Sequence, residues 1–210
     1  MPTHPPRHSE TPTNGDDAVQ FDRVYRDHVD RIFRFAHRLC GEENDAKDLV
    51  QETFLNAYRG LKDFRGEASI TTWLYTIASN ASVRMRRRRK GEPQRELSLE
   101  EFVPTSEGEF QLQFPAEGLT PQQTVENKEL RRLLSQAIQK LPKKYRLVLV
   151  LRDMEGLSAK EVGSIVKLNE RAVKSRLHRA RLFVRKELSA KGMETPSVTR
   201  VKRKVDSPRN

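Results

Sequence analysis

Apolar residues recur at intervals of three and four positions in every patterned segment of this chain, a spacing typical of amphipathic helices. Three such segments follow one another between residues 18 and 90, and more lie between residues 126 and 189. No segment shows the alternation of a half-buried strand. Each helix has one apolar face that another helix must cover. The pattern therefore predicts an all-α protein made of two small helical domains.

The helical spacing is lost at both ends of the chain and between the two domains. Residues 1–17 are polar and rich in proline, and residues 190–210 are basic, so both are predicted to be disordered tails. Residues 91–125 are predicted to be a flexible acidic linker, since nine acids and only two bases fall between Glu92 and Glu129. Fully extended, about thirty residues reach roughly 100 Å, which would allow the domains to lie far apart.

The charge balance indicates a polyanionic partner. Lysines and arginines number 40 against 29 aspartates and glutamates, a net charge of +11, which suits nucleic acid or an anionic membrane surface. The single cysteine, Cys40, excludes an internal disulfide and fits a buried helix residue in a reducing cytosol. The sequence has neither an apolar run near 18 residues nor the apolar core of a signal peptide, so we expect a soluble, cytoplasmic protein.

The C-terminal domain carries the pattern of a helix-turn-helix. Pro142 is predicted to open a helix at its first position. Ser158 and Glu161 have the spacing of a capping box, and Asn169 can cap the following helix. A short helix, a tight turn and a longer basic helix would place the second helix in a major groove. A helical hairpin with a solvated basic face remains the alternative. His178 is interpreted as a surface residue rather than a metal ligand, because no partner ligands lie at suitable spacing.

The third helix of the N-terminal domain ends in a concentration of positive charge. Six of the seven residues from Arg84 to Lys90 are basic. Single-stranded nucleic acid binders combine stacking aromatics, polar groups and cations, a mixture found here. Trp73 lies on the apolar stripe, which favours a core position. A solvated helix end or an anionic lipid site are alternatives. The outward line of this helix consists of Thr72, Thr76, Asn80, Arg84 and Arg88, with the aromatics Phe64 and Tyr75 nearby.

The preceding helix has an acidic and amide-bearing face, unsuited to DNA. Three interpretations are open: a protein-docking surface, a solvated face, or a metal site of a nuclease. The carboxylates lie on one helix without a supporting histidine, which disfavours the nuclease. The face is formed by Asp45, Asp48, Gln51, Glu52 and Asn56.

Two stretches resemble a known family in the family's own order. DAKDLVQETFLNAYRGLKDFRG (residues 45–66) and TTWLYTIASNASVRMRRRR (71–89) look like region 2 of a bacterial sigma factor, and LPKKYRLVLVLRDMEGLSAKEVGSIVKLNERAVKSRLHRAR (141–181) looks like region 4. With only a short acidic linker between them, the chain resembles the extracytoplasmic-function (ECF) subgroup of the sigma-70 family. Region 2 would span residues 18–90 and region 4 residues 126–189.

The resemblance implies a promoter-specificity subunit that binds core RNA polymerase and promoter DNA, with an anti-sigma factor as a further partner. It implies no enzyme activity, cofactor or metal. Polymerase would be bound by Asp45, Asp48, Leu49, Gln51, Glu52, Phe54 and Asn56. The melted −10 element would be bound by Phe64, Arg65, Thr72, Trp73, Tyr75, Thr76, Asn80, Arg84, Arg87 and Arg88. The duplex −35 element would be bound by Arg152, Ser158, Arg171, Lys174, Ser175, Arg176, His178 and Arg179.

The sequence departs from the family pattern at the start of the predicted recognition helix. Arg171 stands where many relatives have a small residue, and Asn169 with Glu170 replaces a proline-containing cap. The −35 sequence preference is therefore not carried over. The competing hypothesis is a free-standing helix-turn-helix regulator. Such a regulator would use only the C-terminal domain. The positive charge at the end of the third helix of the N-terminal domain would then have no function.

Overall fold

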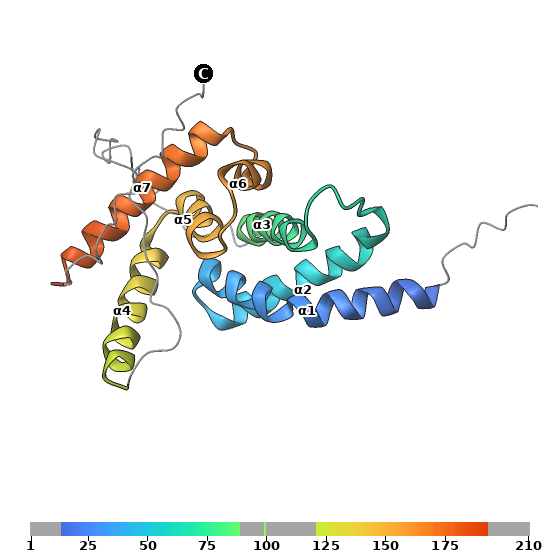
Figure 1. Ribbon diagram of the computed structural model, residues 1–210, viewed down its shortest axis with the longest axis horizontal. Helices are drawn as coiled ribbons and strands as arrows, with labels where there is room; N and C mark the ends of the chain where they lie inside the picture. Colours follow the sequence, from blue (N-terminus) through green and yellow to red (C-terminus); the bar gives the residue numbers. More distant parts are fainter. Residues whose placement is uncertain (1–13, 89–98, 100–120, 193–210) are drawn as a thin grey trace, which may run out of the picture.

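The N-terminal domain is a bundle of three helices. The computed structural model describes residues 14–88, Leu99 and residues 121–192. The bundle comprises α1 (Asn14–Cys40), α2 (Glu43–Gly60) and α3 (Ile70–Arg88), with a 3₁₀ turn, η1 (Leu61–Asp63), after α2. Each helix packs against the other two (Figure 1). Three helices were predicted here, but α1 begins at Asn14 rather than near residue 18.

The C-terminal domain contains four α-helices and one π-helical turn. These are α4 (Pro121–Lys140), α5 (Lys143–Leu149), the π turn η2 (Val150–Met154), α6 (Ala159–Val166) and α7 (Glu170–Ser189). Helix α4 begins at Pro121, inside the segment predicted to be linker. Pro142 precedes α5 as its N-cap, with φ −55° and ψ 138°, instead of occupying the first helical position. The predicted order of helices is confirmed.

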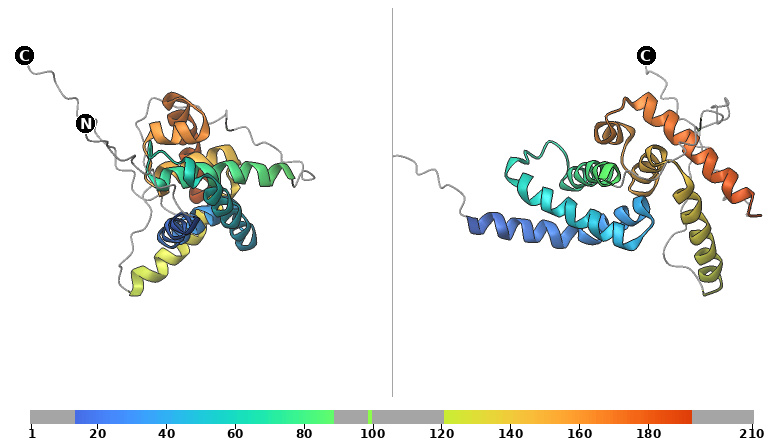
Figure 2. Two further views of the ribbon diagram at one scale, coloured as in Figure 1. Left: turned by 90° about the vertical axis from the view of Figure 1, so that its right-hand side faces the viewer. Right: turned by 180° about the vertical axis from the view of Figure 1, so that it is seen from behind.

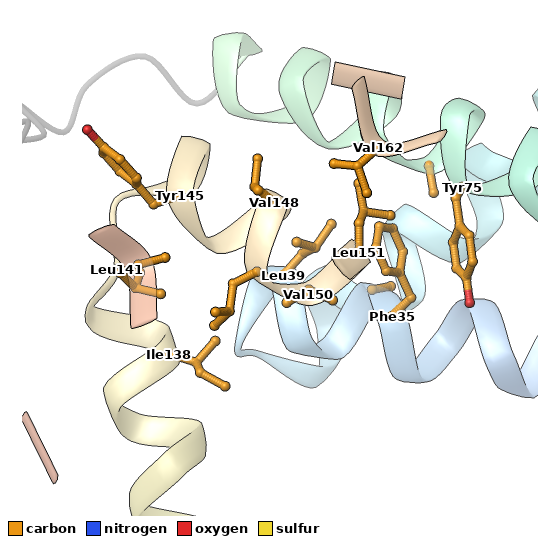
Figure 3. Close-up of a cluster of buried hydrophobic side chains, with 14 of the residues drawn as sticks. Phe35, Leu39, Tyr75, Ile138, Leu141, Tyr145, Val148, Val150, Leu151 and Val162 are labelled. Carbon is orange, nitrogen blue, oxygen red and sulfur yellow. The ribbon is translucent and has the colours of Figure 1, made fainter. Parts of the chain in front are cut away.

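The two domains are packed against each other. Buried side chains of α1, α4, α5, η2 and α6 belong to one apolar cluster, in which Phe35 and Leu39 of the first domain lie near Val150, Leu151 and Val162 of the second (Figure 3). Helix α6 lies beside α3, as all the ribbon views show (Figures 1 and 2). The separation that an extended linker would allow is therefore not the arrangement observed.

A buried arginine joins the end of α1 to the C-terminal domain. Arg146 is 6% exposed and donates from Nη1 to the carbonyl oxygen of Leu39 at 2.7 Å and to Oε1 of Gln139 at 2.6 Å. It also donates from Nη2 to the carbonyl oxygen of Leu141 at 3.1 Å, and Gln139 donates to the carbonyl oxygen of Arg38 at 2.9 Å. Burial lowers the pKa of Arg146 to about 10, so it stays charged at neutral pH. The last carbonyls of α1, which no intrahelical donor reaches, are thus satisfied by the other domain.

Several predictions fall outside the described residues. These are the tails up to residue 13 and from residue 193, and the linker up to residue 120 apart from Leu99, whose side chain is buried. Residues 89 and 90 of the arginine run also lie outside. In the part of the chain that the structure describes, no helix has the length and apolar content needed to span a bilayer.

Candidate nucleic-acid interface

The helix-turn-helix is held by two side-chain caps that the sequence predicted. Ser158 Oγ accepts from the backbone N–H of Glu161 at 3.2 Å, while the Glu161 carboxylate accepts from the Ser158 N–H at 2.8 Å and from its hydroxyl at 2.7 Å. Asn169 Oδ1 accepts from the N–H of Ala172 at 2.8 Å and caps α7. Both predicted caps are confirmed, and together they satisfy N-terminal donors that the helices leave unpaired.

The turn between α6 and α7 depends on backbone shape. Lys167 adopts the left-handed conformation, with φ 56° and ψ 50°, and ends α6. Gly163 is buried, and a Cβ added there would lie 2.5 Å from the carbonyl oxygen of Leu168. Only glycine allows the backbone of the turn to pass so close. This close approach sets the angle at which α7 leaves α6.

The side chains of α7 that were predicted to read DNA are exposed or half-buried. Arg171 and Lys174 are exposed, while Ser175, Arg176, His178 and Arg179 are half-buried. The pKa of His178 is lowered by burial first and by Arg181 and Arg179 second, so its imidazole is neutral at pH 7. A neutral imidazole can accept as well as donate a hydrogen bond to a base edge. These side chains combine fixed cations with polar groups, as a major-groove reader requires.

An ion pair that sequence reasoning missed anchors α7 to η2. Arg181 donates from Nε to Asp153 Oδ2 at 2.8 Å and from Nη2 to Oδ1 at 2.6 Å, and the two side chains are 9% and 1% exposed. Such a two-point bond fixes orientation as well as distance. Arg152, the neighbouring residue in η2 predicted to contact phosphate, is half-buried. The ion pair therefore positions the turn that carries Arg152.

Helix α3 keeps part of its predicted reading line open. Arg65, in the loop before α3, and Asn80 are exposed, and Thr76 is half-buried with its hydroxyl donating to the carbonyl oxygen of Thr72 at 3.0 Å. Phe64 and Trp73 pack with ring centroids 5.0 Å apart, and both are half-buried. Arg84 is exposed, whereas the side chains of Arg87 and Arg88 lie outside the described part of α3.

The first turns of the same helix are covered by the C-terminal domain. Thr72 is 7% exposed and lies against Glu161 of α6, whose pKa is lowered mainly by Ser158 and to a smaller extent by Thr72. Tyr75 is 1% exposed, packs on Phe35 with centroids 4.8 Å apart, and donates its hydroxyl hydrogen to Glu155. In this arrangement neither Thr72 nor Tyr75 is at an open surface, unlike the sequence-based expectation.

The acidic face of α2 lies next to the arginines of α3. Asp48 and Gln51 are exposed, and Asp45, Glu52 and Asn56 are half-buried. The Glu52 carboxylate accepts from Arg84 Nε at 3.2 Å and pairs with its Nη2 at 3.1 Å. Residues of both helices line a groove of about 600 Å³, namely Asp48, Gln51, Glu52, Leu55, Asn56, Arg59, Arg84 and Met85.

Two residues predicted to contact polymerase lie in the core instead. Leu49 is 0% exposed and Phe54 is 5% exposed. A partner cannot reach Leu49 without opening the bundle, so its contribution is to hold α2 in place. Leu55, which the prediction omitted, is 50% exposed on this side of α2. Among the described residues, no cluster of three or more histidines, cysteines or acids could hold a metal ion.

Comparison with known proteins identifies both domains. The profile of sigma-70 region 2 matches residues 24–92, and that of sigma-70 region 4 matches residues 131–184. The ECF sigma factor SigW of Bacillus subtilis is 38% identical over 160 residues, covering 76% of this chain and 83% of SigW. The chain belongs to the ECF RNA polymerase sigma factors. SigE of Mycolicibacterium smegmatis is a further relative of this sigma factor, 34% identical over 183 residues, covering 86% of this chain and 67% of SigE.

Solved structures agree with this sigma factor in fold. RpoE from Bartonella quintana, solved with the anti-sigma factor NepR, gives a TM-score of 0.58 at 22% identity, covering 81% of this chain and 97% of RpoE. CnrH, solved with the cytosolic domain of CnrY, gives a TM-score of 0.55 at 22% identity, covering 82% of this chain and 90% of CnrH. At these identities the likeness concerns the fold alone.

Proposed function

We propose that this sigma factor docks on core RNA polymerase through α2, reads the melted −10 element with α3 and reads the duplex −35 element with α7. Polymerase carries out the phosphodiester chemistry, so this chain needs neither a catalytic residue nor a cofactor. A subunit working on chromosomal promoters acts in the cytoplasm, at the nucleoid.

One observation carries the proposal. The acidic face of α2 and the arginine-bearing end of α3 lie side by side in one bundle, connected by the Glu52–Arg84 ion pair, while the same chain holds a helix-turn-helix. An acidic surface repels DNA and suits a protein, whereas a basic helix end attracts phosphates. A free-standing regulator would need only the helix-turn-helix.

The α3 surface suits an unpaired strand. Extruding a base from the duplex costs a few kcal/mol, which stacking and polar contacts in a pocket offset. The Phe64–Trp73 pair offers an aromatic surface, and Asn80 and Arg65 offer exposed polar and cationic groups. The arginines at the end of α3 would hold backbone phosphates.

The α7 surface suits a duplex. Exposed arginine can bond O6 and N7 of guanine at two points, and lysine can hold a base edge or a phosphate. Arg171 and Lys174, both exposed near the start of α7, are the first candidates for base contacts. Arg152 lies in η2 and Ser158 is the N-cap of α6. Both are assigned to contacts with the phosphate backbone.

In vitro transcription tests this function. Purified core polymerase is supplied with fragments of the source genome, with and without the protein. Discrete start sites that depend on the protein establish the function, and the sequences they share reveal both promoter elements. No new starts, combined with specific duplex binding by the protein alone, would instead identify a free-standing regulator.

The docking surface has a separate test. Asp48→Lys places a positive charge on the exposed face of α2 and should abolish co-elution with core polymerase. Glu52 is left unchanged, because reversing its charge would break its ion pair with Arg84. The control is Glu43→Lys, an exposed acid in the first turn of α2, which should still co-elute. Co-elution of the Asp48 variant at wild-type level contradicts the assignment.

We infer that an anti-sigma factor controls this protein. Support comes from RpoE and CnrH, whose solved structures are complexes with NepR and CnrY. Native protein isolated from uninduced cells should carry a stoichiometric second protein that blocks transcription in the reconstituted assay. Isolation that repeatedly gives only polymerase would contradict control by such a factor.

A further inference from the structure

A carboxylate of the C-terminal domain is buried among side chains of the N-terminal domain. Glu155 follows η2, and its side chain is 5% exposed. It accepts from the Tyr75 hydroxyl and from Arg38 Nη1 at 2.6 Å, and Arg31 Nε lies 4.0 Å away. All three partners come from α1 and α3. The bonds exist only while the two domains are packed together.

The contact covers two side chains of the proposed −10 reading face. The hydroxyl of Tyr75 is bonded to Glu155. Thr72, one turn earlier on α3, lies against Glu161 of α6. The two are 1% and 7% exposed. Helix α6 lies beside α3 in the views of Figures 1 and 2. A DNA strand cannot reach these side chains until the C-terminal domain moves away.

The packed arrangement also conflicts with simultaneous reading of two promoter elements. Elements centred near −10 and −35 are 25 positions apart, which is roughly 85 Å of straight duplex at about 3.4 Å per step. Helices α3 and α6 are in contact, and α7 follows α6 directly. The domains must therefore separate before both elements are bound.

We propose that Glu155 is a clasp that holds the free protein closed, with the C-terminal domain covering Thr72 and Tyr75 on the promoter-reading face of α3. The consequence of the clasp for promoter binding rests on the proposed function. The closed state itself can be measured on the free protein. Its bonds are charge-assisted and buried, which makes them strong. They are also polar, so each group can be hydrated once the domains part. Polymerase binding would supply the free energy for opening.

The closed state is tested on the free protein by double electron–electron resonance. Spin labels are placed on cysteines introduced at Asp22 of α1 and Ser189 of α7, both exposed, in a Cys40→Ser background. The parent protein should give one narrow distance distribution. Glu155→Ala should add a longer, broad component and raise the open-to-closed ratio roughly tenfold or more, because a hydrogen bond to a charged group is lost.

A matched control and a second variant make the result decisive. Glu187→Ala removes an acid whose ion pair, with Lys140 at 2.6 Å, lies within the C-terminal domain, and it should leave the distribution unchanged. Arg38→Met removes the other end of the clasp and should open the protein as Glu155→Ala does. Circular dichroism confirms that each variant keeps its helices.

The outcomes separate the clasp from the sigma function. If the distance distribution stays narrow and short in both Glu155→Ala and Arg38→Met, the proposed role of Glu155 is wrong, even when transcription depends on the protein. A parent protein that is already open in solution overturns it equally. Opening in both variants supports the clasp even when no promoter is transcribed, a result that would sink only the proposed function.

Discussion

The hydroxyl of Tyr75 in α3 is bonded to the carboxylate of Glu155, 80 positions further along the chain and in the other domain. Burial raises the pKa of the phenol, and Glu155 raises it further, so Tyr75 stays protonated and acts as a permanent donor. A residue that the family resemblance assigns to promoter DNA is thus engaged within the free protein. The binding surface and the domain interface share this side chain.

Replacing Tyr75 with phenylalanine removes the donor and keeps the ring that packs on Phe35. The buried Glu155 carboxylate then loses a hydrogen bond, so the free energy of unfolding should fall by about 1.5–3 kcal/mol. Urea denaturation measures the change. Tyr58→Phe is the control, because Tyr58 is 54% exposed on α2, and its effect should be close to zero. Equal effects of the two variants would show that the bond adds no stability.

Arg146 should be among the most sensitive positions in the chain. Arg146→Met leaves buried carbonyls of α1 and α4 without a donor, at about 1–3 kcal/mol for each unsatisfied group, so we expect a loss of about 3–5 kcal/mol. The midpoint of thermal unfolding should fall accordingly. Lys128→Met, at an exposed site of α4, serves as the control and should change the midpoint little. A midpoint near that of the parent would contradict the role of Arg146 as an interdomain joint.

Local chemistry made much of the fold predictable. The caps by Ser158 and Asn169 act on residues three positions away, so a short stretch of sequence is enough to find them. The contacts of Glu155 were not predictable, because Arg38 and Tyr75 are 117 and 80 positions away and only tertiary packing brings them together. A single sequence gives spacing along the chain and says little about distances across it.

The predicted site residues show the same difference between local spacing, which the sequence reveals, and tertiary packing, which it does not. Leu49 belongs to the apolar spacing that predicted α2, and this spacing correctly indicates a core position. The resemblance placed Leu49 at the polymerase surface, since it transfers positions without their orientation. Asp153 and Arg181 were missed because neither a motif nor a regular spacing connects η2 with α7. Thr72 and Tyr75 were expected to be open, because the sequence does not reveal that Thr72 lies against Glu161 of α6 and that Tyr75 is bonded to Glu155.

The capping box should make stability depend on pH in the acid range. The pKa of Glu161 is held below its usual value of 4.5, chiefly by the side chain and backbone N–H of Ser158. For a carboxylate with a lowered pKa in the folded state, the stabilisation is complete above the unfolded pKa and is lost as the pH falls through the folded pKa. Glu161→Gln should therefore be less stable than the parent at pH 7 and approach it below pH 4.5.

A second background checks the origin of this effect. Ser158→Ala removes the hydroxyl that bonds to Glu161. Losing this N-cap should lower the free energy of unfolding by about 1 kcal/mol. In that background, the pH-dependent difference caused by Glu161→Gln should shrink. Thermal unfolding at several pH values measures both differences. A difference that stays the same with and without the Ser158 hydroxyl would assign the effect to another partner of Glu161.

Gly163 should be irreplaceable in the turn that sets the recognition helix. Gly163→Ala introduces a methyl group 2.5 Å from the carbonyl oxygen of Leu168, so the backbone of the turn must shift. We expect a loss of about 2–3 kcal/mol, as for an overpacked core. Duplex binding at the −35 element should weaken further, because α7 would enter the groove at a changed angle. Ser164→Ala, at the exposed next position, is the control for stability and for the promoter affinity of the protein bound to core polymerase, measured by fluorescence anisotropy. Wild-type affinity in Gly163→Ala would mean that the spacing of the turn does not determine how α7 reads DNA.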